Sequence, residues 1–353
     1  MLRSAIVGCG NIGKGHAPAY KGCREIQLAA VVDILRDRAA SLGKEHGVPA
    51  YTKLKDVLKR PDIDFIDVCV PSGLHGDIAI AAAKAGKHCI VEKPLDVTPQ
   101  RCDEIIAAFQ GSGTVLGGIY QHRYHDDTRK LKAALDAGRL GKLTLLTCST
   151  PWWRTQEYYE SGDWRGTWNL DGGGALMNQS IHAIDLLVWF GGPVKRVTAY
   201  CALLAHERIE VEDVAVAACE FQSGALGVIE GTTAAYPGSG VLHKVMGTGG
   251  MVYLTADKIT HWRLRDEEGA TAEKPQANVP AETVSKGAAA DPTVLSDNLF
   301  SRNLDDIARA ARTGGQPCVT GAEARKGVEV ICAIYESART GKEVRLPLRE
   351  FHA

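Results

Sequence analysis

The sequence lacks the features that would direct it to a nucleic acid or a membrane. Its 41 Lys and Arg residues are balanced by 42 Asp and Glu residues, which leaves a formal net charge of −1. Without an excess of positive charge there is no electrostatic basis for binding nucleic acid. No apolar run approaches the roughly 18–20 residues of a membrane helix, and no signal peptide precedes the first apolar segment. We therefore expect neither nucleic acid nor membrane as a partner.

The cysteines lack the spacing of a metal site or a disulfide framework. Ten of them are scattered along the chain, with no Cys-x-x-Cys pair and no histidine at zinc spacing. Several, such as Cys69 and Cys219, lie within apolar segments. Free, buried cysteines in a reducing compartment are the favoured interpretation, with disulfides as the alternative. We expect a cytoplasmic protein with no bound metal.

What the sequence does contain is two successive patterns, which predict two domains. In residues 1–123, short apolar runs alternate with helix-length amphipathic segments. The apolar runs are candidate strands at 4–7, 28–32, 65–70, 88–91 and 115–120. Strands that are apolar on both faces and alternate with helices predict an α/β Rossmann domain, which is a doubly wound parallel sheet.

Residues 124–353 show a different pattern, in which strands follow one another with few helices between them. After a helical segment at 128–137, candidate strands lie at 143–149, 194–203, 214–221, 225–233, 241–247, 251–255 and 259–264. The sequence Gln222-Ser223-Gly224 predicts a hairpin turn. A polar stretch at 267–292 predicts a surface loop, before helices at 295–312 and 322–340 and a short strand at 344–346. We expect an α+β domain with a large, mostly antiparallel open sheet.

A glycine motif follows the first strand directly. Residues 8–13 read GCGNIG, which matches G-x-G-x-x-G, and a second apolar strand ends in Asp33 twenty residues later. The glycines permit a tight turn and a close approach of a pyrophosphate to the N-terminus of a helix, and Asp33 is placed to accept hydrogen bonds from ribose hydroxyls. A carboxylate there repels a 2′-phosphate, so the predicted cofactor is NAD. A tight turn without nucleotide is the alternative.

Two further loops end strands at the carboxyl edge of the predicted sheet, where open α/β sheets bind ligands. They contain the sequences VPSGLH at 70–75 and VEKPL at 91–95. We assign cofactor binding to Gly8, Gly10, Asn11, Ile12, Gly13, Asp33, Pro71, Ser72, His75, Glu92 and Lys93. Lys93 could also reach a substrate oxygen, although a solvated surface lysine has the same pattern.

Taken together, these motifs resemble the Gfo/Idh/MocA family of sugar and polyol dehydrogenases. The resemblance covers nearly the whole chain and rests on the glycine motif, on Glu92-Lys93-Pro94, and on GGGALMNQSIH at 172–182 with Asp185. It implies that Lys93 is catalytic, that His182 is the general acid–base, and that the chain forms a homodimer or homotetramer. The predicted activity is hydride transfer between NAD and a secondary alcohol of a sugar, an inositol or a nucleotide-sugar.

The segment after the glycine run carries its own chemical pattern. Asn178, His182 and Asp185 fall at i, i+4 and i+7, so on a helix they share one face. Histidine titrates near neutral pH and can take a hydroxyl proton, and Asp185 could orient it. A surface His–Asp pair on a helix is the alternative. Many family members have Asp at the position of Asn178 and Gly at that of Ser180, so a relay assisted by that Asp is in doubt here.

An aromatic-rich segment at 151–168 holds four of the six tryptophans. Flat aromatic faces pack on the C–H faces of sugar rings, and arginine offers forked donors. Anchoring of a loop would use the same residues. We expect substrate contacts from Lys93, Gln121, Arg123, Arg154, Trp164, Asn178 and His182.

Three other activities remain open at this point. One is the reverse reduction of a keto-sugar or anhydro-sugar. Another is NAD-dependent glycoside cleavage through transient oxidation. The third is a non-catalytic regulator that senses NAD and a sugar, although such a regulator has no need of both Lys93 and His182.

Overall fold

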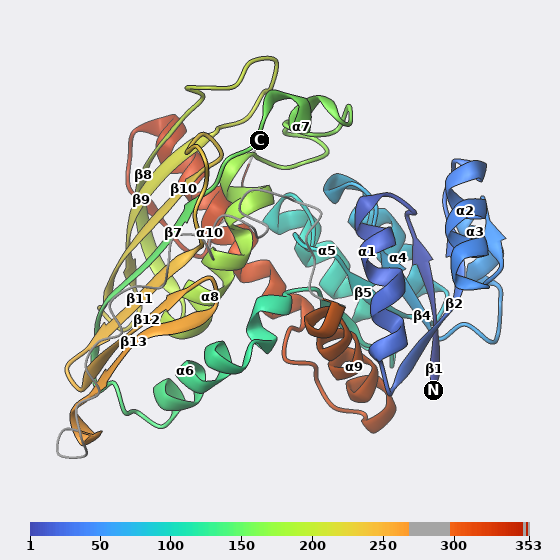
Figure 1. The fold of residues 1–353 in the computed structure, drawn as a ribbon, viewed down its shortest axis with the longest axis horizontal. Helices are drawn as coiled ribbons and strands as arrows, with labels where there is room; N and C mark the ends of the chain where they lie inside the picture. Colours follow the sequence, from blue (N-terminus) through green and yellow to red (C-terminus); the bar gives the residue numbers. More distant parts are fainter. Residues whose placement is uncertain (268–296, 349–350, 352–353) are drawn as a thin grey trace. The chain divides into compact units, whose positions relative to one another are not determined.

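The computed structural model describes residues 1–267, 297–348 and 351 (Figure 1). The chain divides into two compact units. The first consists of Met1–Gln121 and Leu295–Arg325, and the second of His122–Val294 and Lys326–Ala353. Each unit is described by itself below.

The first unit is built on a six-stranded parallel sheet in the order β3-β2-β1-β4-β5-β6. Its strands are β1 (Leu2–Val7), β2 (Ile26–Val32), β3 (Ala50–Tyr51), β4 (Phe65–Val68), β5 (His88–Val91) and β6 (Leu116–Gly118). The interior strands are buried on both faces, as their uninterrupted apolar runs predict. The predicted Rossmann architecture is confirmed, and the sequence missed only the two-residue edge strand β3.

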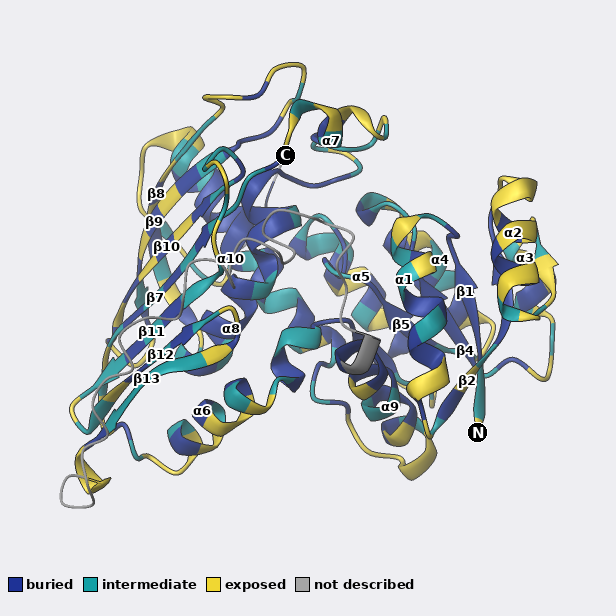
Figure 2. Ribbon diagram, in the orientation of Figure 1, coloured by how far each residue is buried: buried dark blue, intermediate teal, exposed yellow. Residues whose placement is uncertain are grey.

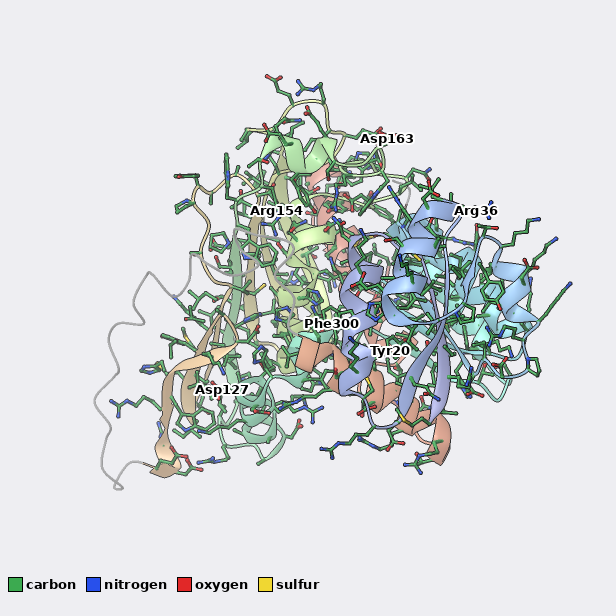
Figure 3. The ribbon with its side chains drawn as sticks, turned by 45° about the vertical axis from the view of Figure 1, so that its right-hand side comes forward. Tyr20, Arg36, Asp127, Arg154, Asp163 and Phe300 are labelled. Carbon is green, nitrogen blue, oxygen red and sulfur yellow. The ribbon has the colours of Figure 1, made fainter. Side chains whose placement is uncertain are left out.

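Helices connect and cover these strands. They are α1 (Asn11–Ala19), α2 (Arg36–His46), α3 (Leu54–Leu58), α4 (His75–Lys84), α5 (Pro99–Phe109) and α9 (Asp297–Thr313), with short 3-10 turns η1 (Tyr20–Gly22) and η2 (Ser72–Leu74). Helix α9 follows the second unit's strands in sequence yet packs with α1 and η1, and its Phe300 joins Tyr20 in one core cluster (Figure 3). The predicted boundary at residue 123 therefore differs from the compact units by the segment Leu295–Arg325. A single cut in the chain cannot describe a segment that returns.

The second unit is built on an eight-stranded sheet in the order β13-β12-β11-β7-β10-β9-β8-β14. Its strands are β7 (Leu143–Pro151), β8 (Val194–Ala202), β9 (Val214–Phe221), β10 (Leu226–Thr232), β11 (Leu242–Gly247), β12 (Gly250–Thr255), β13 (Lys258–Leu264) and β14 (Val344–Arg345). Neighbours are antiparallel except β7 and β10, which run parallel. The prediction of a mostly antiparallel sheet is confirmed.

Alternating burial along β9 and β10 shows that one face of this sheet is covered and the other is open (Figure 2). The covering elements include α8 (Ile181–Gly191), which packs on β7 and β11, and a π-helical turn, η4 (Ala175–Ser180), against β10. The remaining helices are α6 (Asp126–Asp136), α7 (Gln156–Glu160) and α10 (Gly321–Thr340), with the 3-10 turns η3 (Gln121–Tyr124) and η5 (Arg265–Glu267). Helix α10 begins in the first unit and continues in the second.

The predicted loop at 267–292 lies outside the described residues except for Glu267, the last residue of η5. None of the ten cysteines, all within the described residues, forms a disulfide, and eight of them are buried. Across the residues that the structure describes, no helix is long and apolar enough to cross a membrane.

Candidate functional site

The glycine motif forms the turn from β1 into α1. Gly8 has a φ of +102°, and a Cβ on it would lie 2.4 Å from the carbonyl oxygen of Cys69. Only glycine fits such a turn. A Cβ on Gly10, by contrast, would meet no heavy atom within 4 Å, so the backbone of Gly10 borders open space at the N-terminus of α1. An open backbone at a helix N-terminus suits a pyrophosphate, as the motif predicts.

Asp33 lies at the end of β2 and holds two loops in place. One carboxylate oxygen accepts the N–H of Cys9 at 2.8 Å, and the other accepts the N–H of Leu35 at 2.8 Å. Each oxygen of a carboxylate has a second lone pair, so Asp33 retains the capacity to accept ribose hydroxyls. The residue therefore fits the adenosine site and also shapes the glycine turn, a contact that the motif alone does not reveal.

The loops after β4 and β5 are tied together by His75. Its Nδ1 lies 2.8 Å from the carbonyl oxygen of Pro94 and its Nε2 lies 2.9 Å from that of Val70. The side chain is almost fully buried. This geometry favours a structural role for His75 over the predicted direct contact with the cofactor. Pro71 and Ser72 belong to the same loop, where η2 begins.

Glu92 and Lys93 follow β5 and depend on a buried cluster beneath them. One oxygen of Glu92 accepts the N–H of Lys93 at 2.9 Å, and the other lies 2.9 Å from Nε2 of His16. Nδ1 of His16, on α1, lies 2.9 Å from Asp67 on β4, whose carboxylate also accepts the hydroxyl of Tyr20. The cluster joins the helix of the glycine motif to the loop that carries Lys93.

The cluster is also the one place among the described residues where metal-ligand atoms gather. Ligand atoms of His16, Asp67 and Cys69 lie within 4.8 Å of one another, and all three side chains are buried. Burial alone would lower the pKa of His16, but the charge of Asp67 and their hydrogen bond raise it well above its ordinary value. A charged imidazolium between two carboxylates accounts for the cluster as a set of hydrogen-bonded ion pairs.

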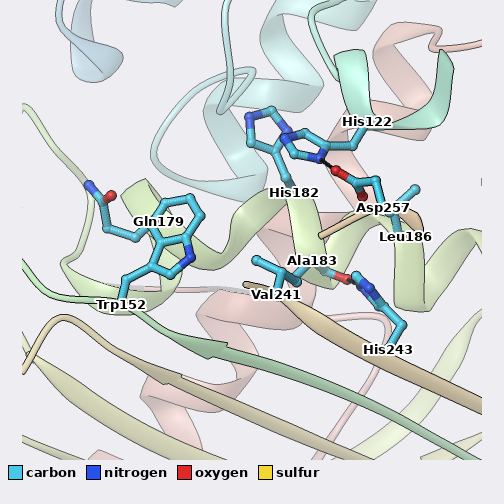
Figure 4. A pocket seen from close by; sticks show the side chains of 9 residues that line it. All are labelled: His122, Trp152, Gln179, His182, Ala183, Leu186, Val241, His243 and Asp257. Carbon is cyan, nitrogen blue, oxygen red and sulfur yellow. Dashed lines mark hydrogen bonds and ion pairs between the residues drawn. The ribbon is translucent and has the colours of Figure 1, made fainter. Parts of the chain in front are cut away.

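In the second unit, a pocket forms around His182, one turn into the helical segment that follows the glycine run (Figure 4). The pocket is lined by His122, Trp152, Gln179, His182, Ala183, Leu186, Val241, His243 and Asp257. Two polar atoms point to a ligand, because Nε1 of Trp152, a donor, and Nδ1 of His243 are buried without a hydrogen-bond partner among the described groups. Native proteins satisfy nearly all such atoms, so a hydroxyl group in this hollow, which has room for about one water molecule, would complete them.

The glycine run before His182 has a packing role. Gly173 has a φ of +150°, and a Cβ on Gly174 would lie 2.0 Å from the backbone oxygen of Glu212. The buried carboxylate of Glu212 accepts the N–H groups of Gly174 and Leu176 at the start of η4. Its pKa is raised to about 7 because burial disfavours its charge. The run therefore lets η4 begin against Glu212, which fixes the start of the helical segment that carries His182.

Two predicted substrate residues turn out to lie outside the pocket lining. The guanidinium of Arg154 is 3% exposed, donates to Gln179 at 3.1 Å, and stacks 4.8 Å from the ring of Trp152. Arg154 therefore contacts two residues of the pocket lining, Gln179 and Trp152, without lining the pocket itself. Trp164 is half-buried beneath Arg165, at 4.6 Å, and does not line the pocket.

Arg123 and Asp185 form a buried ion pair in which each oxygen of the carboxylate accepts one N–H of the guanidinium, at 2.8 and 2.6 Å. This pairing favours a structural role for Arg123 over substrate contact, and it occupies the carboxylate that we expected to orient His182. Asn178 donates to Asp171 and accepts from Gln179 at 2.8 Å. Gln121, in the first unit, has a buried side-chain oxygen without a partner among the described groups.

The sequence analysis did not predict the carboxylate that pairs with His122 beside His182. The ring of His122 lies 4.6 Å from that of His182, centroid to centroid, and Nδ1 of His122 lies 2.6 Å from the carboxylate of Asp257. His122 belonged to a segment expected near the site, but Asp257 lies in a hairpin turn 135 residues further along. Only the pairing of β12 with β13 brings that turn to His122, and no spacing in the sequence signals it.

A Rossmann sheet with an open glycine turn and a carboxylate at the end of its second strand defines an NAD-dependent oxidoreductase. Comparisons with known proteins identify the family. Residues 2–119 match the model for the oxidoreductase family with an NAD-binding Rossmann fold, and residues 128–253 match the GFO/IDH/MocA C-terminal domain. The chain belongs to the Gfo/Idh/MocA family.

The relatives include myo-inositol 2-dehydrogenase of Thermotoga maritima, which is 30% identical over 76% of this chain and 79% of that protein. The NAD(+)-dependent scyllo-inositol 2-dehydrogenase of Bacillus subtilis is 25% identical over 99% and 97% of the two chains. Among solved structures, the WlbA dehydrogenase of Bordetella pertussis, in complex with NADH and UDP-GlcNAcA, is 31% identical, with a TM-score of 0.84 over 98% of this chain and 99% of that one.

These findings confirm the predicted family, the fold class, the NAD cofactor and an oxidoreductase acting on the alcohol groups of sugar-type molecules. The roles assigned to individual residues stay predictions.

Proposed function

We propose that this protein oxidises a secondary alcohol on the ring of a cyclic polyol or pyranoside, with His182 as the acid–base group and Lys93 as the group that binds the reacting oxygen. The observation that carries the proposal is the pocket of the second unit. There a titratable imidazole, an indole face and two unsatisfied polar atoms line one hollow. A hydroxylated ring offers a C–H face to the indole, and its hydroxyl groups can pair with both polar atoms.

Bound NAD supplies the acceptor for the hydride. The chain's own residues handle the proton and the alignment of the alcohol. His182 takes the hydroxyl proton as the carbon is oxidised, and it returns a proton in the reverse direction. Lys93 donates a hydrogen bond to the same oxygen and stabilises the negative charge that develops there. Glu92 and His16 hold the backbone of Lys93, so that its amine starts from a fixed point at the end of β5.

The relatives narrow the substrate class in two directions. The inositol dehydrogenases indicate a free cyclic polyol, and the complex of WlbA with UDP-GlcNAcA indicates a nucleotide-linked pyranose. The ring that both classes share is what we expect to contact Trp152 and His182 of the pocket lining. A small 2-hydroxy acid has no ring face to stack on the indole of Trp152.

A panel of substrates tests the proposal directly. The protein is incubated with NAD and with myo-inositol, scyllo-inositol, levoglucosan, a methyl glucoside, UDP-GlcNAcA, lactate, malate or a simple aliphatic alcohol, and NADH is followed by absorbance. We expect turnover with at least one cyclic compound and none with the acids or the aliphatic alcohol. Turnover confined to 2-hydroxy acids would overturn the substrate class. Release of the aglycone without net NADH would instead establish glycoside cleavage, and binding of sugar and NAD without any turnover would establish a regulator.

The proposal extends to assembly and compartment. The open face of the eight-stranded sheet exposes large apolar side chains, an arrangement that favours association. We propose a homodimer or homotetramer formed through that face. Ten cysteines without a disulfide among them suit the reducing conditions of the cytoplasm, where we place the protein.

A further inference from the structure

The pocket contains a buried carboxylate at an unusual place, the tip of a hairpin. Strands β12 and β13 are joined by the two residues Ala256 and Asp257, and Thr255 pairs with Lys258 across the turn. Hairpin tips normally face water, and their residues are polar for that reason. Asp257, however, is only 7% exposed, and it lines the pocket together with His182.

The backbone of the turn is the one that a two-residue hairpin with positive φ at both central residues requires. Ala256 and Asp257 have φ values of +48° and +61°, a left-handed geometry that glycine, asparagine and aspartate favour, so that Ala256 is the unusual residue of the turn. Outliers of this kind gather at functional sites, where the surrounding structure holds a side chain in a useful place. Here Asp127 of α6 accepts the N–H of Ile259 at 2.9 Å, which pins the hairpin close to the turn.

The turn aims Asp257 at a group of histidines. Its carboxylate lies 2.6 Å from Nδ1 of His122 (Figure 4). The same carboxylate lies 3.7 Å from Nε2 of His125. Burial alone would raise the pKa of Asp257, but the two histidines lower it below its ordinary value, so the carboxylate stays charged. His122 in turn lies against His182, with their rings inclined by 37°.

The other carboxylates near His182 already accept hydrogen bonds from neighbouring side chains. Asp185, one turn further along α8, forms a bidentate ion pair with the guanidinium of Arg123. Position 178 offers only an amide, and that amide donates to Asp171. We propose that the His122–Asp257 pair is the positioning and charge-stabilising partner of His182, which favours the imidazolium that forms when His182 takes the substrate's proton.

The proposal rests on the function proposed above, in which His182 is the acid–base group. The proton leaves the hydroxyl oxygen and adds to His182, while the electron pair of the C–H bond leaves as hydride to the nicotinamide. His182 thereby gains one positive charge. With His122 neutral and hydrogen-bonded to Asp257, the negative charge of Asp257 acts on His182 across the His122 ring and lowers the energy of that state. Removal of the charge should make His182 harder to protonate.

The surroundings offer few other charges that would confuse the test. His125 and Asp126, at the start of α6, and Lys258 on β13 face the same histidines, and so does His243 on β11. All four stay unchanged in the variants below.

The experiment measures the protonation of His182 without any substrate. Full-length protein with saturating NAD and with ¹³C in the Cε1 position of histidine is titrated by NMR, and the His182 resonance is assigned by its absence in His182→Gln. Two variants remove the charge, Asp257→Asn and Asp257→Gly, and both residues tolerate the left-handed backbone. Ala256→Gly is the matched control, because it relaxes the same turn and keeps the carboxylate.

We expect the titration midpoint of His182 to fall by about one pH unit in both charge-removing variants, the scale of one lost unit charge several ångströms away. Ala256→Gly should leave the midpoint unchanged. A midpoint that stays at the native value in Asp257→Asn and Asp257→Gly, or that rises, would overturn the proposal. Turnover in His182→Gln is measured separately on the substrate found by the panel. Native turnover there would overturn the function proposed for His182, whatever the NMR result.

Discussion

At the scale of single residues, several side chains with a predicted binding role also make structural contacts. Asp33 is placed for a ribose and also fixes the glycine turn through Cys9. Arg154, which the sequence suggests as a substrate ligand, instead holds Gln179 and Trp152 in the pocket wall. Residue type and position in a motif therefore suggest candidate residues, while the contacts of the folded chain decide what each one touches.

The choice of NAD over NADP is tested at Asp33. Asp33→Ala should weaken NAD binding by about tenfold to a hundredfold, because hydrogen bonds from ribose hydroxyls to a charged acceptor are lost. NADP binding should change less, because relief of the repulsion between the carboxylate and the 2′-phosphate offsets the loss of hydrogen bonds. Titration of both cofactors by protein fluorescence measures the ratio. Asp37→Ala, an exposed carboxylate on α2, serves as the control, and a native protein that prefers NADP would contradict the assignment.

The roles of His182 and Lys93 are tested by turnover. His182→Ala should lower kcat by roughly 10²–10⁴, the usual contribution of a general acid–base, and leave NAD affinity near native. Lys93→Ala should cause comparable damage, and Lys93→Arg should not restore the rate, because a guanidinium is larger and differs in geometry. Lys84→Ala, an exposed lysine at the end of α4, should be native-like. Near-native kcat in either alanine variant would refute the role assigned to that residue.

At the scale of elements, the sequence predicted regular strands and helices well and the irregular pieces poorly. The apolar runs at 88–91 and 214–221 match β5 and β9 to the residue. The π-helical turn η4 was expected as ordinary helix, and the carboxylate that accepts the N–H groups at its start, Glu212, lies far away in the sequence. The parallel pairing of β7 with β10 was also invisible, since alternation along a strand does not reveal the direction of its neighbour.

The His16 cluster joins elements α1, β4 and β5, and it should show in the pH dependence of stability. The folded-state pKa of His16 is raised, so its contribution is complete below the unfolded pKa, at about pH 6.5, and is lost as pH rises through the folded value. His16→Gln should lower the free energy of unfolding by about 3–5 kcal/mol at pH 6, because two buried carboxylates lose their cation. The loss should be smaller at pH 9.

Urea denaturation at both pH values measures these differences. His46→Gln, in the last turn of α2 of the same unit, serves as the control and should show no such dependence on pH. An equal loss for His16→Gln at pH 6 and pH 9 would mean that His16 is held as a neutral group.

At the scale of the whole molecule, the second unit's sheet has one face that its own helices leave open. Tyr200, Val216, Leu226 and Val228 lie on neighbouring strands β8, β9 and β10, and each is more than 40% exposed. Alternating burial places them on one side, away from α8 and η4. Contiguous apolar surface of this kind on a folded protein marks a site of association.

The open face should therefore bury these side chains against a second copy of the chain. Light scattering after size exclusion should give the mass of a dimer or tetramer for the native protein. The pair Val216→Lys and Leu226→Lys should shift that mass toward the monomer, because each places a charge where the interface excludes water, and an unpaired buried charge costs several kcal/mol.

Matched substitutions at exposed positions of α2, such as Arg38→Glu and Lys44→Glu, should leave the mass unchanged. A native monomer, or an oligomer indifferent to both lysines, would show that this face is not the interface. The pocket around His182 lies entirely within one unit of one chain, so a monomeric variant that still folds should keep its NMR titration of His182 even if its turnover falls.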